Sequence, residues 1–230
     1  MNTAIISGAN GNLGRSIAQR FLEGKWRVYA LCKQADAAKL LAKSLEQFSG
    51  SLSLVVCDLA SIVSVQHFLT ASGLKNVDAV IHTAGGIEAG RTIEETESNV
   101  VHAMLEINYL TAFNLLRVTL PLLKVRGGAV LTIGAKAALS PEANKAAYAA
   151  SKAALIALTQ TTAEEGKPHS VTANCIVPGV IDTPANREWG TPDEIAKWVM
   201  PETIAEAAWM LCNDGGRGIS GSILPMMGKM

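Results

Sequence analysis

The stretch Ala4 to Gly14, with the sequence A-I-I-S-G-A-N-G-N-L-G, determines the fold that we expect for the whole chain. It begins with a short apolar run that stops at a glycine. Apolar residues then recur at helical spacing, at Leu13, Ile17 and Phe21. This change of period predicts a buried strand that turns sharply into a helix.

Three glycines in this turn, at positions 8, 11 and 14, are typical of a phosphate-binding site. Glycine permits a tight bend, lets backbone N–H groups approach a pyrophosphate, and lets the helix pack closely on the strand. The positive end of the helix then faces the anion. An ordinary strand-to-helix turn is the alternative. The turn residues expected to bind a cofactor are Ser7, Gly8, Asn10, Gly11, Leu13 and Gly14.

The composition suits one α/β domain over residues 1–230, because 49% of the residues are hydrophobic and only 17% are charged. Twenty basic residues balance twenty acidic ones, and this balance argues against nucleic acid or an anionic membrane as partner. We therefore expect a small-molecule partner.

The four cysteines are scattered and form no C-x-x-C pair, so we expect buried, reduced thiols. The histidines show no spacing typical of a metal site. The first residues lack a basic segment followed by a long apolar stretch, and no run approaches the ~20 apolar residues of a membrane helix. We expect a cytoplasmic protein without a metal.

Strand and helix patterns alternate along the chain, which indicates a parallel α/β sheet. Strands are predicted over residues 4–6, 27–32, 52–57, 78–83, 128–133, 170–177 and 223–226. Further helices are predicted over 36–48, from an N-cap at Ser61 to 72, over 100–120 with an end at Pro121, from Tyr148 onwards, and over 201–213. Residues 184–200 are expected to form a flap, with a short helix capped by Thr191.

The ends of the second and third predicted strands bear on the cofactor. In dinucleotide-binding folds an acidic residue after the second strand binds the ribose hydroxyls, whereas a basic one accommodates a 2'-phosphate. Here Cys32 is followed by Lys33, which favours NADP(H), although a solvated lysine fits equally well and NAD(H) is the alternative. Asp58 and Leu59 follow the third strand, where adenine would lie, although Asp58 also suits a turn.

Small and polar residues mark two further positions. Ala84, Gly85 and Gly86 follow the fourth strand, where they would let the backbone lie against a cofactor or simply give a flexible loop. Asn108 falls among apolar residues of the long predicted helix, and a buried asparagine needs hydrogen-bond partners.

Tyr148 and Lys152 are spaced four residues apart in a predicted helix, so they share one helical face. An ammonium near a phenol favours its ionised form, which makes tyrosine a usable proton donor near neutral pH. Taken alone, this spacing is also common between two surface residues.

Over almost its whole length the chain resembles the short-chain dehydrogenase/reductase family. The resemblance is carried by the order and spacing of Ser7-Gly8 to Gly14, Ala84-Gly85, Asn108, Tyr148-x-x-x-Lys152, and Asn174-x-x-x-Pro178-Gly179 with Thr183. It implies a single-domain Rossmann-type doubly wound parallel sheet of strand order 3-2-1-4-5-6-7 and a nicotinamide cofactor. It further implies that Tyr148 donates a proton, that Lys152 lowers the tyrosine pKa and holds the nicotinamide ribose, and that Asn108 holds a relay water.

The same resemblance implies that the segment after the sixth strand, Pro178, Gly179, Val180 and Thr183, also binds the cofactor. It implies a homodimer or homotetramer as well, because the helices around Asn108 and after Tyr148 pair across a two-fold axis in this family.

Two positions depart from the family pattern. The middle glycine of the turn is Gly11, where the family more often has it one place later, at Asn12. The usual serine thirteen residues before the tyrosine is Ala135, so the hydroxyl that orients a substrate carbonyl is missing.

Dihydropteridine reductases in the family also lack that hydroxyl, and the segments 84–86, 134–139 and 182–187 are similar to theirs. They carry an aromatic residue where this chain has Ile87, and an acidic residue after the second strand that this chain lacks. We therefore expect hydride transfer to a small conjugated C=N or C=O acceptor, with quinonoid dihydropterin as the candidate.

Two other functions compete with this expectation. One is a short-chain carbonyl or alcohol dehydrogenase in which Lys136, Thr132 or Thr183 replaces the serine. The other is an NADPH-binding sensor without turnover, against which the intact Tyr148 and Lys152 argue. The substrate-side residues are thus Ala135, Lys136 and Ile87.

Overall fold

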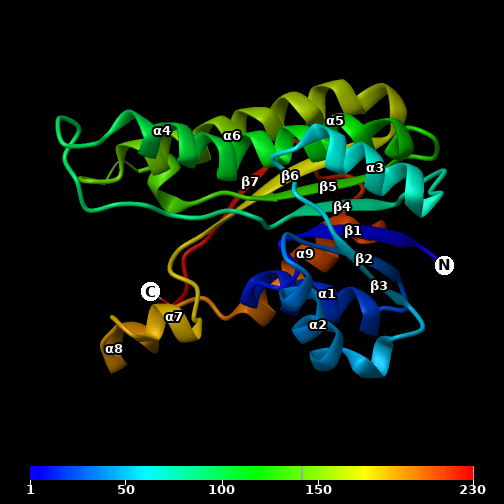
Figure 1. Ribbon diagram of the computed structural model, residues 1–230, viewed down its shortest axis with the longest axis horizontal. Helices are drawn as coiled ribbons and strands as arrows, with labels where there is room; N and C mark the ends of the chain where they lie inside the picture. Colours follow the sequence, from blue (N-terminus) through cyan, green and yellow to red (C-terminus); the bar gives the residue numbers. More distant parts are fainter. Residues whose placement is uncertain (141, 230) are drawn as a thin grey trace.

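A sheet of seven parallel strands, in the order β3-β2-β1-β4-β5-β6-β7, forms the centre of the computed structural model, which describes residues 1–140 and 142–229 (Figure 1). This confirms the predicted doubly wound fold and its strand order. The strands are β1 (Thr3–Ser7), β2 (Arg27–Cys32), β3 (Leu52–Val56), β4 (Ala79–His82), β5 (Gly128–Ile133), β6 (Val171–Pro178) and β7 (Ile223–Met226).

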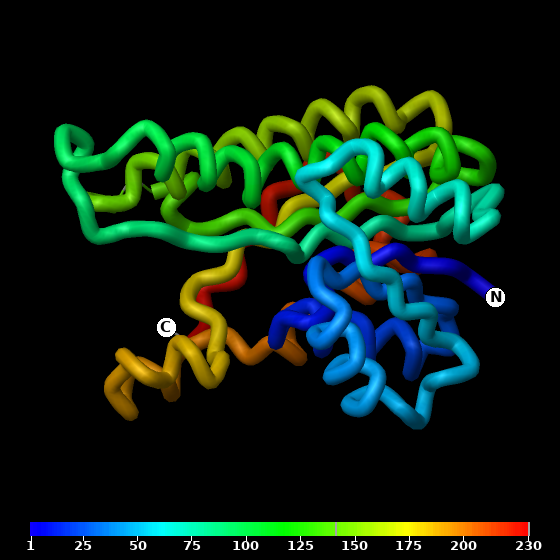
Figure 2. The backbone as a smooth tube through the Cα atoms, viewed as in Figure 1, coloured from blue at the N-terminus to red at the C-terminus, as the bar shows by residue number. Residues whose placement is uncertain are grey.

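Helices cover both faces of the sheet (Figure 2). One face carries α1 (Asn12–Glu23), α2 (Ala35–Ser44) and α9 (Pro201–Cys212), and the other carries α3 (Ile62–Ser72), α4 (Ser98–Leu105), α5 (Thr111–Leu123) and α6 (Ala146–Gly166). Successive residues of β1 serve the two cores in turn, because side chains alternate along a strand. Ile6 packs with Phe21 of α1, whereas Ile5 packs with Leu115 of α5.

The helix predicted over residues 100–120 is not continuous and does not end at Pro121. A π-helical turn, η2 (Glu106–Leu110), joins α4 to α5, and α5 continues through Pro121 to Leu123. Proline removes its own N–H donor and its ring crowds the carbonyl four residues earlier, and here both effects fall close to the end of the helix. The fully buried Leu123 then holds the last turn against the core.

Several other boundaries differ by short stretches. The helix predicted over 36–48 ends as α2 at Ser44, and a 3-10 turn, η1 (Glu46–Phe48), follows it. The remaining 3-10 turns are η3 (Lys136–Ala138), η4 (Lys167–His169) and η5 (Asp214–Gly216). The predicted N-cap at Ser61 is confirmed, since its side chain accepts a hydrogen bond from the Ser64 N–H.

Residues 184–200 form a separate arm at the carboxyl ends of the strands, beside the C-terminus (Figure 1). The arm contains α7 (Pro184–Arg187) and α8 (Pro192–Ile195), and α8 begins with the predicted capping box of Thr191 and Glu194. Ile181 and Val199 pair in a short parallel bridge that closes the base of the arm.

Candidate active site

A cleft of about 550 Å³ opens where the carboxyl ends of the central strands meet. In an open parallel α/β sheet this edge, at the point where the strand order reverses, is the usual ligand position. Fifteen predicted site residues lie in its wall: Gly8, Gly11, Leu13, Gly14, Gly85, Gly86, Ile87, Ala135, Lys136, Tyr148, Lys152, Pro178, Gly179, Val180 and Thr183. The other predicted residues, Ser7, Asn10, Lys33, Asp58, Leu59, Ala84 and Asn108, lie outside this wall.

The glycine turn owes its shape to two of its three glycines. Gly8 has a φ of +63°, a left-handed conformation that favours glycine, and the Gly11 N–H closes the turn on the Gly8 carbonyl at 3.0 Å. A Cβ on Gly14 would collide with that carbonyl, so the helix packs directly on the turn. No side chain caps α1, and its first N–H groups border the cleft.

Ser7 has a structural position that differs from the predicted contact with a cofactor. Its side chain is fully buried, lies 2.9 Å from His82 Nδ1 and accepts a hydrogen bond from the Thr83 N–H. His82 Nε2 lies 3.4 Å from the Thr111 hydroxyl, which donates to the Ile107 carbonyl. The imidazole must therefore donate from Nε2 and accept at Nδ1, and it joins the glycine turn to the π-helical turn.

His82 remains neutral in this environment. Burial, followed by the charge of Lys152, lowers its pKa to about 3. The network of Ser7, His82 and Thr111 thus forms an uncharged support beneath the cleft.

The residues predicted near the adenosine part of a cofactor lie along the neighbouring edge of the sheet. Lys33 is exposed, and its Nζ lies 3.9 Å from Asp58 Oδ1. Asp58 also accepts a hydrogen bond from the Ala60 N–H, which is the alternative turn role, whereas Leu59 is buried in the core. Asn10 is exposed on the turn. Their contacts with a cofactor stay predictions.

Asn108 is fully buried in the π-helical turn and holds the loop after β4. Its Oδ1 accepts from the Gly86 N–H at 3.0 Å, and its Nδ2 donates to the Gly86 carbonyl and to the Ser151 hydroxyl. A Cβ on Gly85 would lie 2.7 Å from Asn108 Oδ1, so Gly85 is needed for close packing rather than for flexibility. The role of Asn108 in holding a relay water stays a prediction.

Ser151 connects this network to the predicted proton donor. Its hydroxyl donates to the Tyr148 carbonyl at 2.8 Å, one helical turn earlier. Both amide hydrogens of Asn108 are thereby used to fix the loop after β4 against the first turns of α6. This is the partner set that a buried asparagine requires.

Tyr148 and Lys152 both line the cleft, and burial rather than the lysine has the largest effect on the tyrosine pKa. Burial raises the pKa of Tyr148, and the negative charge of Glu142 raises it further. Lys152 Nζ instead donates to the Ile133 carbonyl at 2.8 Å, and burial lowers the pKa of Lys152 to about 8. The phenol is therefore protonated at neutral pH, as a proton donor must be.

The substrate side of the cleft has no serine hydroxyl at the family position, because Ala135 stands there in the wall. Of the three suggested replacements, Thr132 is excluded: it is fully buried, lies outside the wall, and its hydroxyl pairs with that of Thr159 at 2.7 Å. Lys136 and Thr183 both lie in the wall. Thr183 also accepts a hydrogen bond from the Asn186 N–H as the N-cap of α7.

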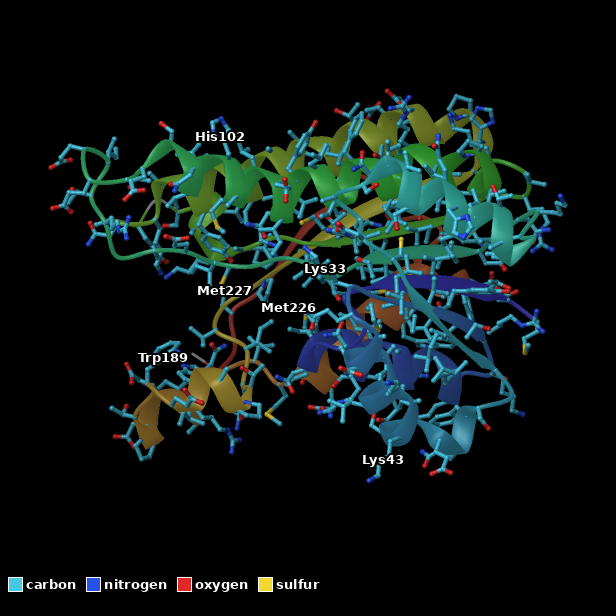
Figure 3. All side chains as sticks on the ribbon, viewed as in Figure 1. Lys33, Lys43, His102, Trp189, Met226 and Met227 are labelled. Carbon is cyan, nitrogen blue, oxygen red and sulfur yellow. The ribbon has the colours of Figure 1, made fainter. Side chains whose placement is uncertain are left out.

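The arm contributes Trp189 and Asn186 to the cleft wall. Figure 3 shows Trp189 on this arm, with Met226 at the end of β7 and Met227 just after it on the side towards the arm. The Lys229 N–H donates to the Lys197 carbonyl, which ties the C-terminal segment to the end of the arm. The predicted flap therefore forms one side of the cleft.

Glu142, Lys145 and Trp189 are wall residues that the sequence analysis missed. Glu142 and Lys145 come six and three residues before Tyr148, so proximity to the predicted proton donor was the available signal. For Trp189 the only signal in the sequence was its position within the predicted flap.

All four cysteines are buried thiols, as predicted, and burial raises the pKa of each of them, that of Cys212 to about 12. Among the described residues, no group of three or more His, Cys, Asp or Glu side chains is placed to hold a metal ion. No helix in the described ranges is both long and apolar enough to cross a membrane.

Comparisons with known proteins agree with this site. The family model described as short chain dehydrogenase matches residues 2–194. The 3-oxoacyl-[acyl-carrier-protein] reductase FabG of Chlamydia trachomatis is 30% identical across 99% of this chain and 96% of its own length. The 7alpha-hydroxysteroid dehydrogenase of Escherichia coli is 30% identical across 98% of this chain and 92% of its own length.

The fold also matches solved structures. One described as ElxO with NADP bound has a TM-score of 0.92 at 20% identity, covering 99% of this chain and 97% of that one. The family model spans the glycine turn, Asn108, Tyr148 and Lys152, and it ends within the arm. The chain belongs to the short chain dehydrogenase family and is an oxidoreductase of that family.

Proposed function

We propose that this protein is an NADP(H)-dependent reductase that transfers hydride to a small conjugated C=N or C=O acceptor, with Tyr148 as proton donor. The observation that carries the proposal is that one cleft brings the glycine turn together with Tyr148 and Lys152. An anion-binding turn and a proton donor in one wall are the two parts that such a reaction needs.

The turn fits a nicotinamide dinucleotide. Gly8 and Gly14 leave a cradle that a Cβ would fill, and the uncapped start of α1 offers N–H donors and a positive helix end for a pyrophosphate. Such a cofactor supplies the hydride when it is bound. The exposed cation of Lys33 at the end of β2 supports NADP(H) over NAD(H), and the structural relative ElxO is described with NADP bound.

The chain's own groups then handle the proton and the orientation. Tyr148, protonated at neutral pH, would donate its phenolic proton to the substrate atom that receives negative charge. The buried ammonium of Lys152, held by the Ile133 carbonyl, would position the ribose and favour the phenolate that forms. Asn108 and Ser151 hold the segments that carry these groups.

The acceptor is the finer part of the proposal. Ala135 offers no hydroxyl to a carbonyl oxygen, so a substrate already activated by conjugation, such as a quinonoid dihydropterin, suits this wall better than a simple ketone. The relatives described above are named for a 3-oxoacyl-[acyl-carrier-protein] and a hydroxysteroid. A carbonyl reductase is therefore the second candidate, supported by Lys136 and Thr183 in the wall.

Steady-state NADPH oxidation by wild type, Tyr148→Phe and Ala135→Ser on one simple ketone and one quinonoid dihydropterin tests the proposal. Tyr148→Phe should lower turnover strongly on either good substrate. Ala135→Ser should improve the ketone up to about a hundredfold, the value of roughly 3 kcal/mol for one oxyanion donor, and change the quinonoid compound little. Equal reduction of both by wild type, unchanged by Ala135→Ser, would favour the carbonyl reductase.

Unchanged NADPH binding with no turnover on any acceptor would favour the sensor.

A homodimer or homotetramer is also part of the proposal. Its support is a row of half-exposed apolar side chains along α4, η2 and α5: Val101, Ile107, Leu110 and Phe113. Sedimentation at micromolar concentration should show the oligomer, and a monomer would contradict it.

A further inference from the structure

Three charged side chains meet in the cleft wall near Tyr148. Lys136 comes from η3, Glu142 from the loop before α6, and Lys145 from the N-cap of α6. Glu142 Oε1 lies 3.8 Å from Lys136 Nζ, while Oε2 forms a direct ion pair with Lys145 Nζ. These three residues form a charged cluster in the same wall as Ala135 and Tyr148.

The charges in this cluster do not balance. One carboxylate serves two ammonium groups, which leaves a net charge of +1. The lysines, Lys145 first, hold the pKa of Glu142 below its usual value and so favour its charged form. Among the described wall residues Glu142 is the only carboxylate, against Lys136, Lys145 and Lys152.

Of the two lysines in this cluster, Lys136 is better placed than Lys145 to bind a second anion. Its contact with Glu142 is long, and its side chain is 56% exposed, whereas that of Lys145 is 34% exposed and closely paired. An ammonium has three donors, and a single carboxylate oxygen at 3.8 Å uses little of that capacity.

Two large apolar side chains border the same cleft. Ile87, after β4, is 59% exposed, and Trp189, on the arm, is 60% exposed (Figure 3). Exposed apolar surface inside a cleft is typical of a ligand-binding wall, and tryptophan offers a broad face to a flat or aliphatic body.

We propose that the substrate is an amphipathic organic anion whose apolar body packs on Ile87 and Trp189 and whose acidic group pairs with Lys136. This inference rests on the proposed reductase function, which it extends to a substrate class. The acidic group of the substrate would then lie beside Lys136, whose other neighbour is Glu142, which in turn pairs with Lys145. Negative and positive groups would thus alternate along the wall. Lys136 then determines specificity and is not the replacement for the missing serine.

A matched pair of probes isolates the acidic group: 4-formylbenzoate and its methyl ester share ring and carbonyl but differ in charge. Reduction of both is followed with NADPH for wild type, Lys136→Met, Lys136→Arg and Glu142→Gln. Lys39→Met is the control, because Lys39 is also an exposed lysine with a carboxylate partner, Asp36, but lies outside the cleft.

We expect Lys136→Met to raise the ratio of KM for the acid to KM for the ester up to about fivefold, the range of a solvent-exposed ion pair, and to act on KM more than on kcat. Lys136→Arg should restore the KM for the acid, and Glu142→Gln should lower it. High salt should reduce the preference of wild type for the acid. Lys39→Met should match wild type.

Equal effects of Lys136→Met on acid and ester would overturn the inference, and a fall in kcat for both would instead assign Lys136 to the carbonyl oxygen. If neither probe is reduced, calorimetric titration of the protein with NADP⁺ and 4-(hydroxymethyl)benzoate or its methyl ester decides the question. Tighter binding of the acid, lost in Lys136→Met, supports the anion site even though the reductase proposal fails for these probes. Equal binding rejects the anion site.

Discussion

Gly85→Ala adds one methyl group at the point where the cofactor loop, the π-helical turn and α6 meet. The new Cβ would lie 2.7 Å from Asn108 Oδ1 and 3.1 Å from Lys152 Nζ, and the first of these distances is too short for a carbon and an oxygen. Asn108 cannot move without breaking its 3.0 Å bond from the Gly86 N–H. The partly buried Gly86 N–H would then lose its partner, and the loss of a fully buried one costs about 1–3 kcal/mol.

We therefore expect Gly85→Ala to lower the free energy of unfolding by about 2 kcal/mol in urea titrations. Turnover should fall about tenfold or more, because Lys152 is displaced together with Asn108. Gly50→Ala is the matched control: an added Cβ meets nothing within 4 Å there, and its effect should stay within about 0.5 kcal/mol.

The double variant Gly85→Ala/Asn108→Ala tests whether the new methyl group acts through Asn108. Shortening Asn108 removes the atom that the new methyl group meets, so the two changes should cost less together than the sum of their separate effects. Additive costs, or a Gly85→Ala protein as stable and active as Gly50→Ala, would refute the packing explanation.

Three other predictions concern the turn, the cofactor and pH. Gly14→Val should abolish nicotinamide binding in a titration while retaining most helical content by circular dichroism, and normal binding by the folded variant would reject the phosphate assignment. Dissociation constants in low and high salt should show NADPH preferred through Lys33 by on the order of 1 kcal/mol, a preference that fades with salt, and tighter NADH binding would reject it. Because the pKa of His82 is lowered from 6.5 to about 3, the unfolded chain binds the extra proton, and stability should fall as pH drops from 6.5 towards 3. At pH 5 this amounts to about 2 kcal/mol in urea titrations, and His82→Asn should remove that pH dependence; an unchanged pH dependence would contradict it.

The elements with strong local signals were predictable. Apolar runs and helical spacing located the seven strands and the main helices, and the capping residues Ser61 and Thr191 marked two helix starts. These signals depend on neighbours a few residues apart, which the sequence shows directly. The strand order came from the family resemblance, because pairing between distant strands leaves no such local mark.

The central members of the candidate site were predictable, but its charged rim and its chemistry were not. The glycine turn, Tyr148 and Lys152 were identified by spacing, and all of them line the cleft. The raised pKa of Tyr148 could not be predicted, because burial and Glu142 dominate it and neither can be judged from a four-residue spacing. That Lys152 lowers this pKa stays a prediction. The helix end predicted at Pro121 was wrong, because the packing of the following turn outweighs one lost hydrogen bond.

By itself, the sequence determined an α/β protein of alternating strands and helices, with a glycine turn at the end of its first strand and a tyrosine and a lysine on one helical face. The doubly wound strand order came with the family resemblance. Only the tertiary structure decided that Asn108 fixes Gly86 and Ser151 through a π-helical turn, and that Thr132 is committed to Thr159. These contacts join residues 22 to 43 positions apart. Hydrogen bonds and ion pairs act over a few ångströms, so their partners are set by how the elements pack and not by their spacing along the chain.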